Sequence, residues 1–498
     1  MLRSTHAQVL IAGALLAACG ARATVATPIA SGPPPVVETV TFARGLDETA
    51  GLTRDSALAA ALADVSPARI RNTDSMLVSF GTRNTFSDTM STTRGIGAAR
   101  RWIYSELSQY SRACNGCLKV EYFGQVQQVR RVAGRDTTFI PANIVDVLAW
   151  LPGRDTSRVI VMSGHYDSCV CAQPGGSFDS TSTAPGADDD GSGSSAVIEL
   201  ARVFSKHFPR GLDASIVLVT VAAEEQGLLG AQQLERRLHE QGYKIVAGMT
   251  DDIVGNVTTE DGTTDSTSMR IFAADPDNSP SRELGRYAWA LDRVYMPSFE
   301  VVPVWRLDRI QRGGDHEPYV MAGDAGLRFT ERLENYNRQH LPTDVFSHVN
   351  FGYVANLARV NAATVGSLAA APATPANARA VRQGRAGPDP AGTTSAASAT
   401  GGQAWTISWD PSPGAVNYEL LVRRTTWPQW QDVVPLGNIT RCTLRRQLDD
   451  EWAGVRAVSA TGARSMAASM PAPNPPRGTP RPPTPRAPAG PPPPVCGG

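Results

Sequence analysis

The chain has 498 residues, of which 42% are hydrophobic, and its 47 basic and 47 acidic residues give a formal net charge of zero. This length allows one large domain with a smaller companion, or two or three domains of ordinary size. A balanced charge argues against a nucleic-acid-binding surface or a polybasic membrane patch, so we expect a small or flexible molecule as the partner.

The N-terminus has the pattern of an export signal. Arg3 precedes the apolar segment "VLIAGALLAA", which is followed by Cys19 and Gly20. A segment this short cannot cross a bilayer, which needs about 20 apolar residues. The sequence "LAAC" resembles the lipobox of bacterial lipoproteins, in which Cys19 would carry the lipid; an ordinary signal peptide cut near residues 21–23 is the alternative. Both interpretations predict an extracytoplasmic protein, either anchored to the membrane, free in a bacterial periplasm, or secreted.

Strand-like and helix-like segments follow one another from about residue 45 to residue 370. The first helical patterns are "TRDSALAAALADV" and "ARRWIYSEL". The expected strands are "KVEYFGQV", "ANIVDVLAWL", "RVIVMSGHYDS", "ASIVLVTVAAEE", "KIVAGMTDDIVGN" and "SMRIFAA", and later helices are expected at 191–208, after Gly227, at "SRELGRYAWALDRV" and at 348–368. Continuous apolar strands that alternate with helices indicate an α/β fold with a largely parallel, buried sheet. In such sheets the functional crevice lies beyond the carboxyl ends of the strands.

The composition changes after the α/β region. Residues 371–402 are rich in Ala, Pro, Thr, Ser and Gly, which predicts a linker that ends in a first weak strand. Residues 403–470 predict a small β-sandwich, because "AWTISWD" alternates with period two and "WDPSPGAVNYELLVRR" resembles a fibronectin type III module. Proline makes up 13 of the 28 residues in 471–498, so this tail is expected to be extended. The remaining segment, 1–23, is the expected signal peptide.

Six further cysteines are Cys114, Cys117, Cys169, Cys171, Cys442 and Cys496. In an exported protein the default expectation for cysteines is disulfide pairing, and a link from "CNGC" to "CVC" is one option. A four-thiolate zinc site is the alternative, which export and the uneven spacing disfavour. The connectivity stays open.

Acidic and histidine side chains gather where the strands are expected to end. These positions are His165, Asp189, the pair Glu224 and Glu225, Asp252, and His340. Clustered carboxylates repel one another unless a cation neutralises them, and imidazole with carboxylate is a normal zinc ligand set. Two zinc ions carry four positive charges, which three carboxylates and one hydroxide would balance. Five side chains can give each of two metals three ligands only if one carboxylate bridges.

Five motifs occur in order along the chain, namely "GHYDS", "GADDDGSG", "AAEEQGLLG", "DDIVGN" and "QHLPTD". This series resembles the co-catalytic di-zinc aminopeptidases of metallopeptidase family 28, which include bacterial leucyl aminopeptidases, over roughly residues 70–370. The resemblance implies the zinc exopeptidase fold, an α/β three-layer sandwich with a mixed, largely parallel central sheet. It also implies two zinc ions per chain.

The resemblance implies a role for each matching residue. The five metal ligands would be His165, Asp189, Glu225, Asp252 and His340, with Asp189 bridging the two ions. Asp167 would orient His165, as carboxylates behind metal-bound histidines do. Glu224 would be the general base, because a carboxylate bound to zinc has lost the basicity that a proton acceptor needs.

The implied reaction is hydrolysis of the N-terminal peptide bond of peptides that have a free N-terminus. A hydroxide that bridges the metals would attack the carbonyl, and Glu224 would pass the proton to the leaving amine. His316 in "GGDHEPY" and Tyr336 are candidate substrate-binding residues. Some relatives have a tyrosine where this chain has Gln339, so the donor to the oxyanion is not assigned.

Other functions remain open at this stage. The same fold carries glutaminyl cyclase-like and carboxypeptidase-like enzymes, and a non-catalytic binding protein could also keep it. The cyclases bind a single zinc, so the full ligand set argues against that activity, and Glu224 argues against a binding protein. No nucleic-acid partner is expected, and contact with a membrane is expected only through a lipid on Cys19.

Overall fold

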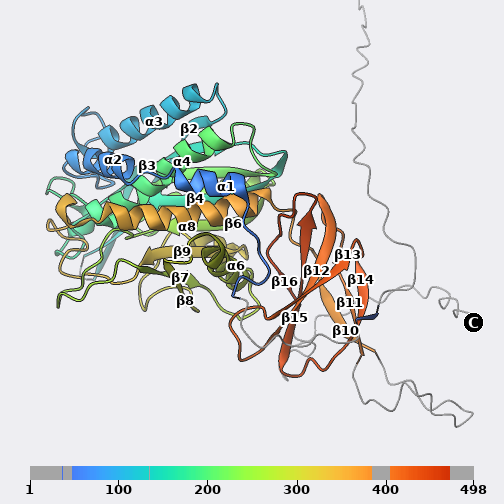
Figure 1. Ribbon diagram of the computed structural model, residues 1–498. Helices are drawn as coiled ribbons and strands as arrows, with labels where there is room; N and C mark the ends of the chain where they lie inside the picture. Colours follow the sequence, from blue (N-terminus) through green and yellow to red (C-terminus); the bar gives the residue numbers. More distant parts are fainter. Residues whose placement is uncertain (1–35, 38–47, 134, 384–403, 471–498) are drawn as a thin grey trace, which may run out of the picture.

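The computed structural model describes residues 36–37, 48–133, 135–383 and 404–470 (Figure 1). The expected signal peptide with Cys19 and the proline-rich tail with Cys496 lie outside these residues. Among the helices of the described residues, none is both long enough and apolar enough to cross a membrane.

The main body is built on an eight-stranded mixed sheet. Its strands are β2 (Lys119–Ala133), β3 (Asp136–Leu151), β4 (Asp155–His165), β5 (Ala214–Val221), β6 (Lys244–Asp251), β7 (Ser268–Ala273), β8 (Glu300–Val304) and β9 (Gly326–Glu331). Their order across the sheet is β2-β3-β5-β4-β6-β9-β7-β8. The central strands β5, β4, β6 and β9 are parallel, whereas β3 and β7 run antiparallel to their central neighbours.

Helices cover both faces of this sheet (Figure 1). They are α1 (Ser56–Ala63), α2 (Pro67–Ser79), α3 (Gly95–Ala113), α4 (Gly193–His207), α5 (Leu229–Glu240), α6 (Pro280–Tyr295), α7 (Glu317–Ala322) and α8 (Phe351–Ala370). One face packs against α3, α4, α6 and α8, with α1 and α2 outside them, and the other face packs against α5 and α7. The predicted α/β sandwich with a mixed, largely parallel sheet is therefore confirmed.

Strand β4 shows why a continuous apolar run suits this position. Successive side chains of a strand point to opposite faces. Val159 and Val161 accordingly pack in the cluster that contains Leu234 of α5, whereas Ile160 and Met162 pack in the cluster on the opposite face. Both faces of β4 are covered, so neither set of positions can be polar.

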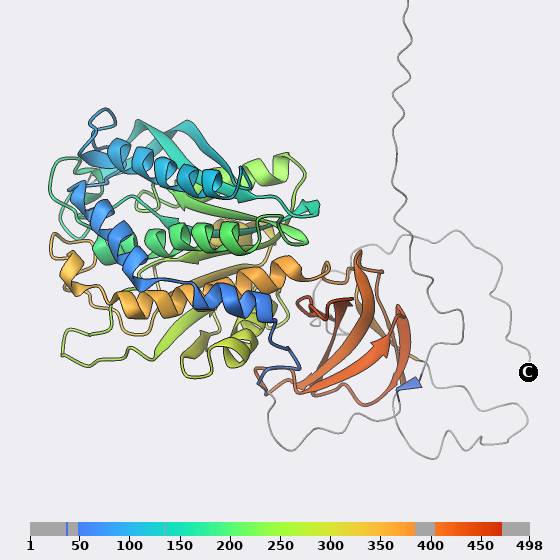
Figure 2. The same ribbon diagram turned by 45° about the horizontal axis from the view of Figure 1, so that its top comes forward.

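The C-terminal part forms two four-stranded sheets, in the orders β1-β14-β11-β10 and β13-β12-β15-β16. All of their strand pairs are antiparallel except β1 with β14, which is parallel. The strands are β1 (Val36–Val37), β10 (Arg379–Arg382), β11 (Ala404–Ser408), β12 (Ala415–Arg424), β13 (Asp432–Gly437), β14 (Arg441–Arg445), β15 (Glu451–Ser459) and β16 (Ala468–Ser469). Figure 2 shows the short blue strand β1 at the edge of this orange body. A segment that precedes the main body thus pairs with the C-terminal part, which the sequence did not predict.

The C-terminal sheets pack directly against the main body beside α6 (Figure 1). Leu421, Trp430 and Met466 belong to the large hydrophobic cluster of the main body. The indole Nε1 of Trp430 donates a 2.9 Å hydrogen bond to Glu283 on α6. The buried Arg423 pairs with Asp277 at 2.7 Å. The C-terminal part is therefore continuous with the core of the main body.

Two disulfides are present among the described residues, and each forms within its own motif. They join Cys114 to Cys117 and Cys169 to Cys171, with Cα–Cα distances of 5.5 and 5.2 Å. Both distances lie in the range that disulfides require. Each motif forms its own disulfide, so the predicted option of a link from "CNGC" to "CVC" is wrong. Cys442 is buried and has no disulfide partner in the described part of the chain.

Candidate metal centre

The predicted ligands lie at the carboxyl ends of adjacent parallel strands, where α/β sheets carry their functional crevices. His165 is the last residue of β4, Glu225 follows β5, and Asp252 follows β6. Asp189 lies in the short helix η2 (Ala187–Ser192) that precedes α4, and His340 lies in the segment after β9. The structure brings all five together.

These side chains form two groups that share one residue. In each group the possible ligand atoms all lie within 4.8 Å of one another; the groups are His165 with Asp189 and Asp252, and Asp189 with Glu225 and His340. Oδ1 of Asp189 lies 3.2 Å from Nε2 of His165, whereas Oδ2 lies 3.0 Å from Nε2 of His340. The two oxygens of Asp189 therefore face two different groups.

The donor atoms fit a bound metal. Nε2 of His165, Oδ2 of Asp189 and Oε1 of Glu225 are buried and have no hydrogen-bond partner within the described residues. An unsatisfied buried polar group costs about 1–3 kcal/mol, and more when it is charged. Two cations would satisfy these atoms, and a set of imidazole and carboxylate donors suits zinc.

The carboxylates also control the protonation of His340. Glu225, followed by Asp189, raises the pKa of His340 to about 10. A cation bound by these carboxylates would replace that proton, because a histidine must be neutral to bind a metal.

Asp167 connects the two glutamates to the first histidine. Its carboxylate oxygens accept the backbone N–H groups of Glu224 at 3.2 Å and of Glu225 at 3.4 Å. Oδ1 of Asp167 lies 3.6 Å from Nδ1 of His165. Asp167 is fully buried. Nδ1 of His165 contacts the backbone carbonyl of Asp167 at 3.2 Å, so the backbone of Asp167 positions this ring while its carboxylate holds the loop that carries the glutamates.

Two further aspartates fix the backbone around Asp189. Asp190 accepts the N–H of His165 at 3.0 Å and that of Gly193, at the start of α4, at 2.8 Å. The carboxylate of Asp344 accepts the N–H of Asp188 and the N–H of Asp189, both at 2.9 Å. Asp344 was not among the predicted site residues, although it is the last residue of the motif "QHLPTD".

The pKa of Glu224 lies above the ordinary value of a glutamate. Burial raises the pKa of Glu224 to about 7, against the opposing influence of His165. A general base works best when its pKa lies near the working pH.

A buried arginine contacts Asp252, which belongs to the group of His165, Asp189 and Asp252. Arg328 is fully buried on β9, and its guanidinium lies 3.0 Å from Oδ1 of Asp252 and 3.2 Å from Oδ2 of Asp308. Arg328 was not among the predicted site residues, because a charged residue in "GLRFTE" obscures the apolar pattern of a buried strand. Arg328 compensates part of the negative charge that the carboxylates concentrate here.

The candidate substrate residues differ in their placement. His316 is fully buried, its Nε2 contacts the carbonyl of Leu307 at 2.9 Å, and burial lowers its pKa to about 4. The neighbouring Asp315 is also buried, and neither of its oxygens has a hydrogen-bond partner in the described part of the chain. Tyr336 is 58% exposed, and the guanidinium of Arg312 lies 5.9 Å from the centre of its ring.

Gln339 is not free to act as a donor to a substrate. Its amide donates to Glu334 at 3.3 Å and accepts from Arg312 at 3.1 Å. The place of the tyrosine found in some relatives is thus occupied by a side chain that is already hydrogen-bonded.

Three residues beside the metal groups have left-handed backbone conformations. Ala223, Ile253 and His340 have φ angles of 59°, 51° and 58°. Such conformations are costly for residues other than glycine and are concentrated at functional sites. They lie directly before Glu224, directly after Asp252, and at a ligand itself.

Comparison with known proteins shows the family of the chain. The model of peptidase family M28 matches residues 146–365. A protein of Pyrenophora tritici-repentis named "Probable zinc metalloprotease" is 35% identical over 83% of this chain and 86% of its own length. A protein of Leptosphaeria maculans with the same description is 35% identical over 81% of this chain and 94% of its own length.

One solved structure is similar to this chain in fold. A crystal structure of LapA from Legionella pneumophila has a TM-score of 0.50 and 21% identity, over 64% of this chain and 77% of LapA. The level of identity to the zinc metalloproteases, over most of both chains, shows the family. The chain belongs to peptidase family M28 and is a zinc metallopeptidase.

Proposed function

We propose that this zinc metallopeptidase is an aminopeptidase that binds two zinc ions per chain. One observation carries the proposal: the two carboxylate oxygens of Asp189 face separate groups, His165 with Asp252 and Glu225 with His340. A carboxylate can bridge two metals in this way, and the remaining four side chains then give each ion two further ligands.

When bound here, zinc would polarise the peptide carbonyl and lower the pKa of a water molecule. The proton movements fall to Glu224, which takes a proton from the attacking water and delivers it to the nitrogen of the leaving amine. Asp167 accepts hydrogen bonds from the N–H groups of Glu224 and Glu225. It therefore fixes the positions of both glutamates relative to His165. A shift of this loop would misplace both glutamates.

The charge of the site supports a substrate with a free N-terminus. Asp315 lies outside the ligand set, and burial, followed by the nearby charge of Glu224, raises its pKa well above the usual range. Both oxygens of Asp315 lack hydrogen-bond partners among the described residues. A substrate α-ammonium group placed near Asp315 would offset this repulsion, whereas a blocked terminus would not.

We also propose that the protein acts outside the cytoplasm. It would either be anchored to a membrane by a lipid on Cys19 or be released after the signal peptide is cleaved. The proposal rests on the apolar segment and "LAAC" in the sequence. Labelling with a radioactive fatty acid, compared between the full chain and Cys19→Ser, tests the lipid directly.

The test of the activity uses chromogenic aminoacyl amides, free peptides and the same peptides with acetylated N-termini. Each is measured before chelation, after chelation and after zinc is added back, while zinc per chain is counted. We expect hydrolysis of free N-termini only, lost on chelation and restored with two zinc ions. One zinc ion with cyclisation of N-terminal glutamine would replace the proposal by a glutaminyl cyclase. Cleavage of blocked peptides would contradict the aminopeptidase specificity.

A further inference from the structure

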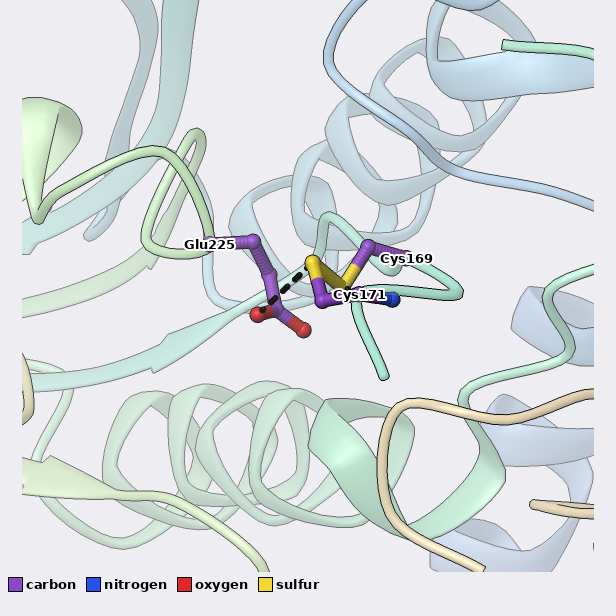
Figure 3. Close-up of side chains that lie close together, drawn as sticks. All are labelled: Cys169, Cys171 and Glu225. Atoms are coloured by element: carbon purple, nitrogen blue, oxygen red, sulfur yellow. Dashed lines mark hydrogen bonds between the residues drawn. A yellow bond between two sulfur atoms is a disulfide. The ribbon is translucent and has the colours of Figure 1, made fainter. Parts of the chain in front are cut away.

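The disulfide of the "CVC" motif lies against a metal-binding side chain. Figure 3 shows the carboxylate of Glu225 pointing toward the bridge between Cys169 and Cys171. Oε2 of Glu225 lies 3.6 Å from Sγ of Cys171. A bridged sulfur carries no hydrogen, so it cannot donate to the carboxylate, and Oε1 of Glu225 also lacks a hydrogen-bond partner within the described residues.

The same loop contacts a second ligand of that metal group. The N–H of Ala172 donates to the backbone carbonyl of His340 at 3.3 Å. Nε2 of His340 in turn lies 3.3 Å from the Glu225 oxygen that faces Cys171. The bridge is therefore placed beside the group of Asp189, Glu225 and His340, and not merely near the site as a whole.

The separation of sulfur and oxygen matches that of two ligands on one zinc ion. Zinc binds carboxylate oxygen at about 2.1 Å and thiolate sulfur at about 2.3 Å, and a tetrahedral angle between them places the two atoms about 3.6 Å apart. The distance between Sγ of Cys171 and Oε2 of Glu225 is 3.6 Å. Cys171 and His340 each share a group of possible ligand atoms with Glu225 but not with each other, so the freed sulfur would have to turn toward the metal to join Glu225 and His340. What keeps the sulfur from binding zinc is the disulfide, because the thiolate is the ligand form of cysteine.

We propose that Cys171 is a latent zinc ligand that its bridge to Cys169 keeps off the metal. Reduction adds two electrons and two protons to the bridge and gives two thiols. The thiol of Cys171 then loses its proton to solvent and binds the zinc of the Glu225 and His340 group. A catalytic zinc site needs an open position, and this sulfur closes it. The inference rests on the proposed two-zinc hydrolysis.

The proposal predicts that oxidation activates the enzyme. Cytoplasmic thiols are kept reduced, whereas compartments outside the cytoplasm favour disulfides. A chain that is exported would therefore become active only after the "CVC" bridge forms, and peptides inside the cell would be spared.

The first test uses full-length protein with Cys114→Ser and Cys117→Ser, which leaves the "CVC" motif as the only disulfide among the described residues. A water-soluble phosphine is the reductant, because it becomes a phosphine oxide with an oxygen from water and, unlike thiol reagents, does not compete as a thiolate for zinc. Cobalt replaces zinc for spectroscopy. We expect reduction to produce a thiolate-to-cobalt charge-transfer band, and activity of the zinc enzyme to fall at least about tenfold, because the open position is lost.

The single variants separate a ligand from a structural bridge. In the same background, Cys169→Ser leaves Cys171 permanently free, and Cys171→Ser removes the sulfur that faces Glu225. We expect Cys169→Ser to show the cobalt band and low activity without reductant. Cys171→Ser should show no band and the same rate with and without phosphine. Equal losses in both variants, with no band in either, would overturn the proposal and leave the bridge as a structural clamp.

The spectrum also separates this inference from the proposed function. If the oxidised enzyme hydrolyses no peptide but reduction still produces the band, the aminopeptidase assignment fails and the latent ligand stands. If the oxidised enzyme is active with two zinc ions and reduction changes neither rate nor spectrum, the latent ligand fails alone.

Discussion

Three consecutive aspartates, residues 188–190, make three different sets of contacts. Asp188 accepts the N–H of Gly255 at 2.7 Å, and Asp190 accepts those of His165 and Gly193. Only Asp189 faces both metal groups. The sequence alone shows three equivalent carboxylates, and it was the resemblance to a motif that indicated the middle one. The hydrogen bonds from Gly255 and His165 come from segments distant in the chain, which no local pattern reveals.

The pair Glu224 and Glu225 gives the sharpest prediction for a single residue. Glu224→Gln removes the proton acceptor and keeps the size of the side chain, so we expect zinc content to stay at the wild-type level and kcat to fall at least about a hundredfold. Zinc is counted by mass spectrometry and kcat is measured on a free aminoacyl amide. Loss of zinc in Glu224→Gln with retained zinc in Glu225→Gln would mean that the two roles are exchanged.

At the scale of elements, strands β4, β5 and β6 could be predicted because their apolar runs are uninterrupted and each is followed by a polar motif. Strands β8 and β9 and helix α7 could not. Strand β9 holds the buried charges of Arg328 and Glu331, and their partners lie on other segments. An ion pair that satisfies a buried charge is visible only in three dimensions, so "GLRFTE" has no strand pattern in the sequence.

Glu334 joins strand β7 to the loops that carry Arg309 and Gln339. It pairs with Arg270 of β7 at 2.6 Å and with Arg309 at 2.7 Å, and it accepts a hydrogen bond from Gln339, which precedes His340. Burial alone would raise the pKa of Glu334, but Arg309 and Arg270 outweigh it and lower the pKa to about 2. The folded state therefore holds the charged form of Glu334 more strongly than the unfolded chain does.

This lowered pKa predicts a stability that depends on pH. The contribution of Glu334 is present above the unfolded pKa of 4.5 and is lost as the pH falls toward 2. The shift corresponds to about 3 kcal/mol near neutral pH. We expect Glu334→Gln to lower the Tm strongly at pH 7 and progressively less below pH 4.5. Both proteins are compared with chelator present, so that release of zinc does not contribute. A difference in Tm that does not change with pH would contradict the assignment.

At the scale of the whole molecule, the C-terminal sheets share a core with the peptidase body. The sequence predicts short strands in 403–470 but not their docking, because the contacts join residues far apart in the chain, such as Trp430 with Glu283. Arg286 on α6 donates to the carbonyl of Pro428 at 2.7 Å, and the hydroxyl of Tyr287 donates to that of Arg464 at 2.8 Å. We therefore expect the two parts to unfold together.

Arg423 tests this joint unfolding. Its buried guanidinium pairs with Asp277 of the main body, so Arg423→Met should destabilise the chain by about 2 kcal/mol. The exposed Arg441 of β14 is the matched control, and Arg441→Met should leave the Tm nearly unchanged. Tryptophan fluorescence and loss of peptidase activity on heating should shift together in Arg423→Met. A fluorescence shift without a shift in the loss of activity would show that the two parts unfold independently.

The central claim is that Asp189 joins two zinc ions in one site, and counting zinc per chain by native mass spectrometry tests it most directly. We predict two ions in the wild-type protein, fewer than one in Asp189→Ala, and a single tightly held ion in Asp252→Asn, since that variant loses a ligand of one group only. Thermal unfolding with chelator present checks that each variant is folded. A wild-type protein that holds one ion, or an Asp189→Ala variant that keeps two at wild-type affinity, would contradict the account.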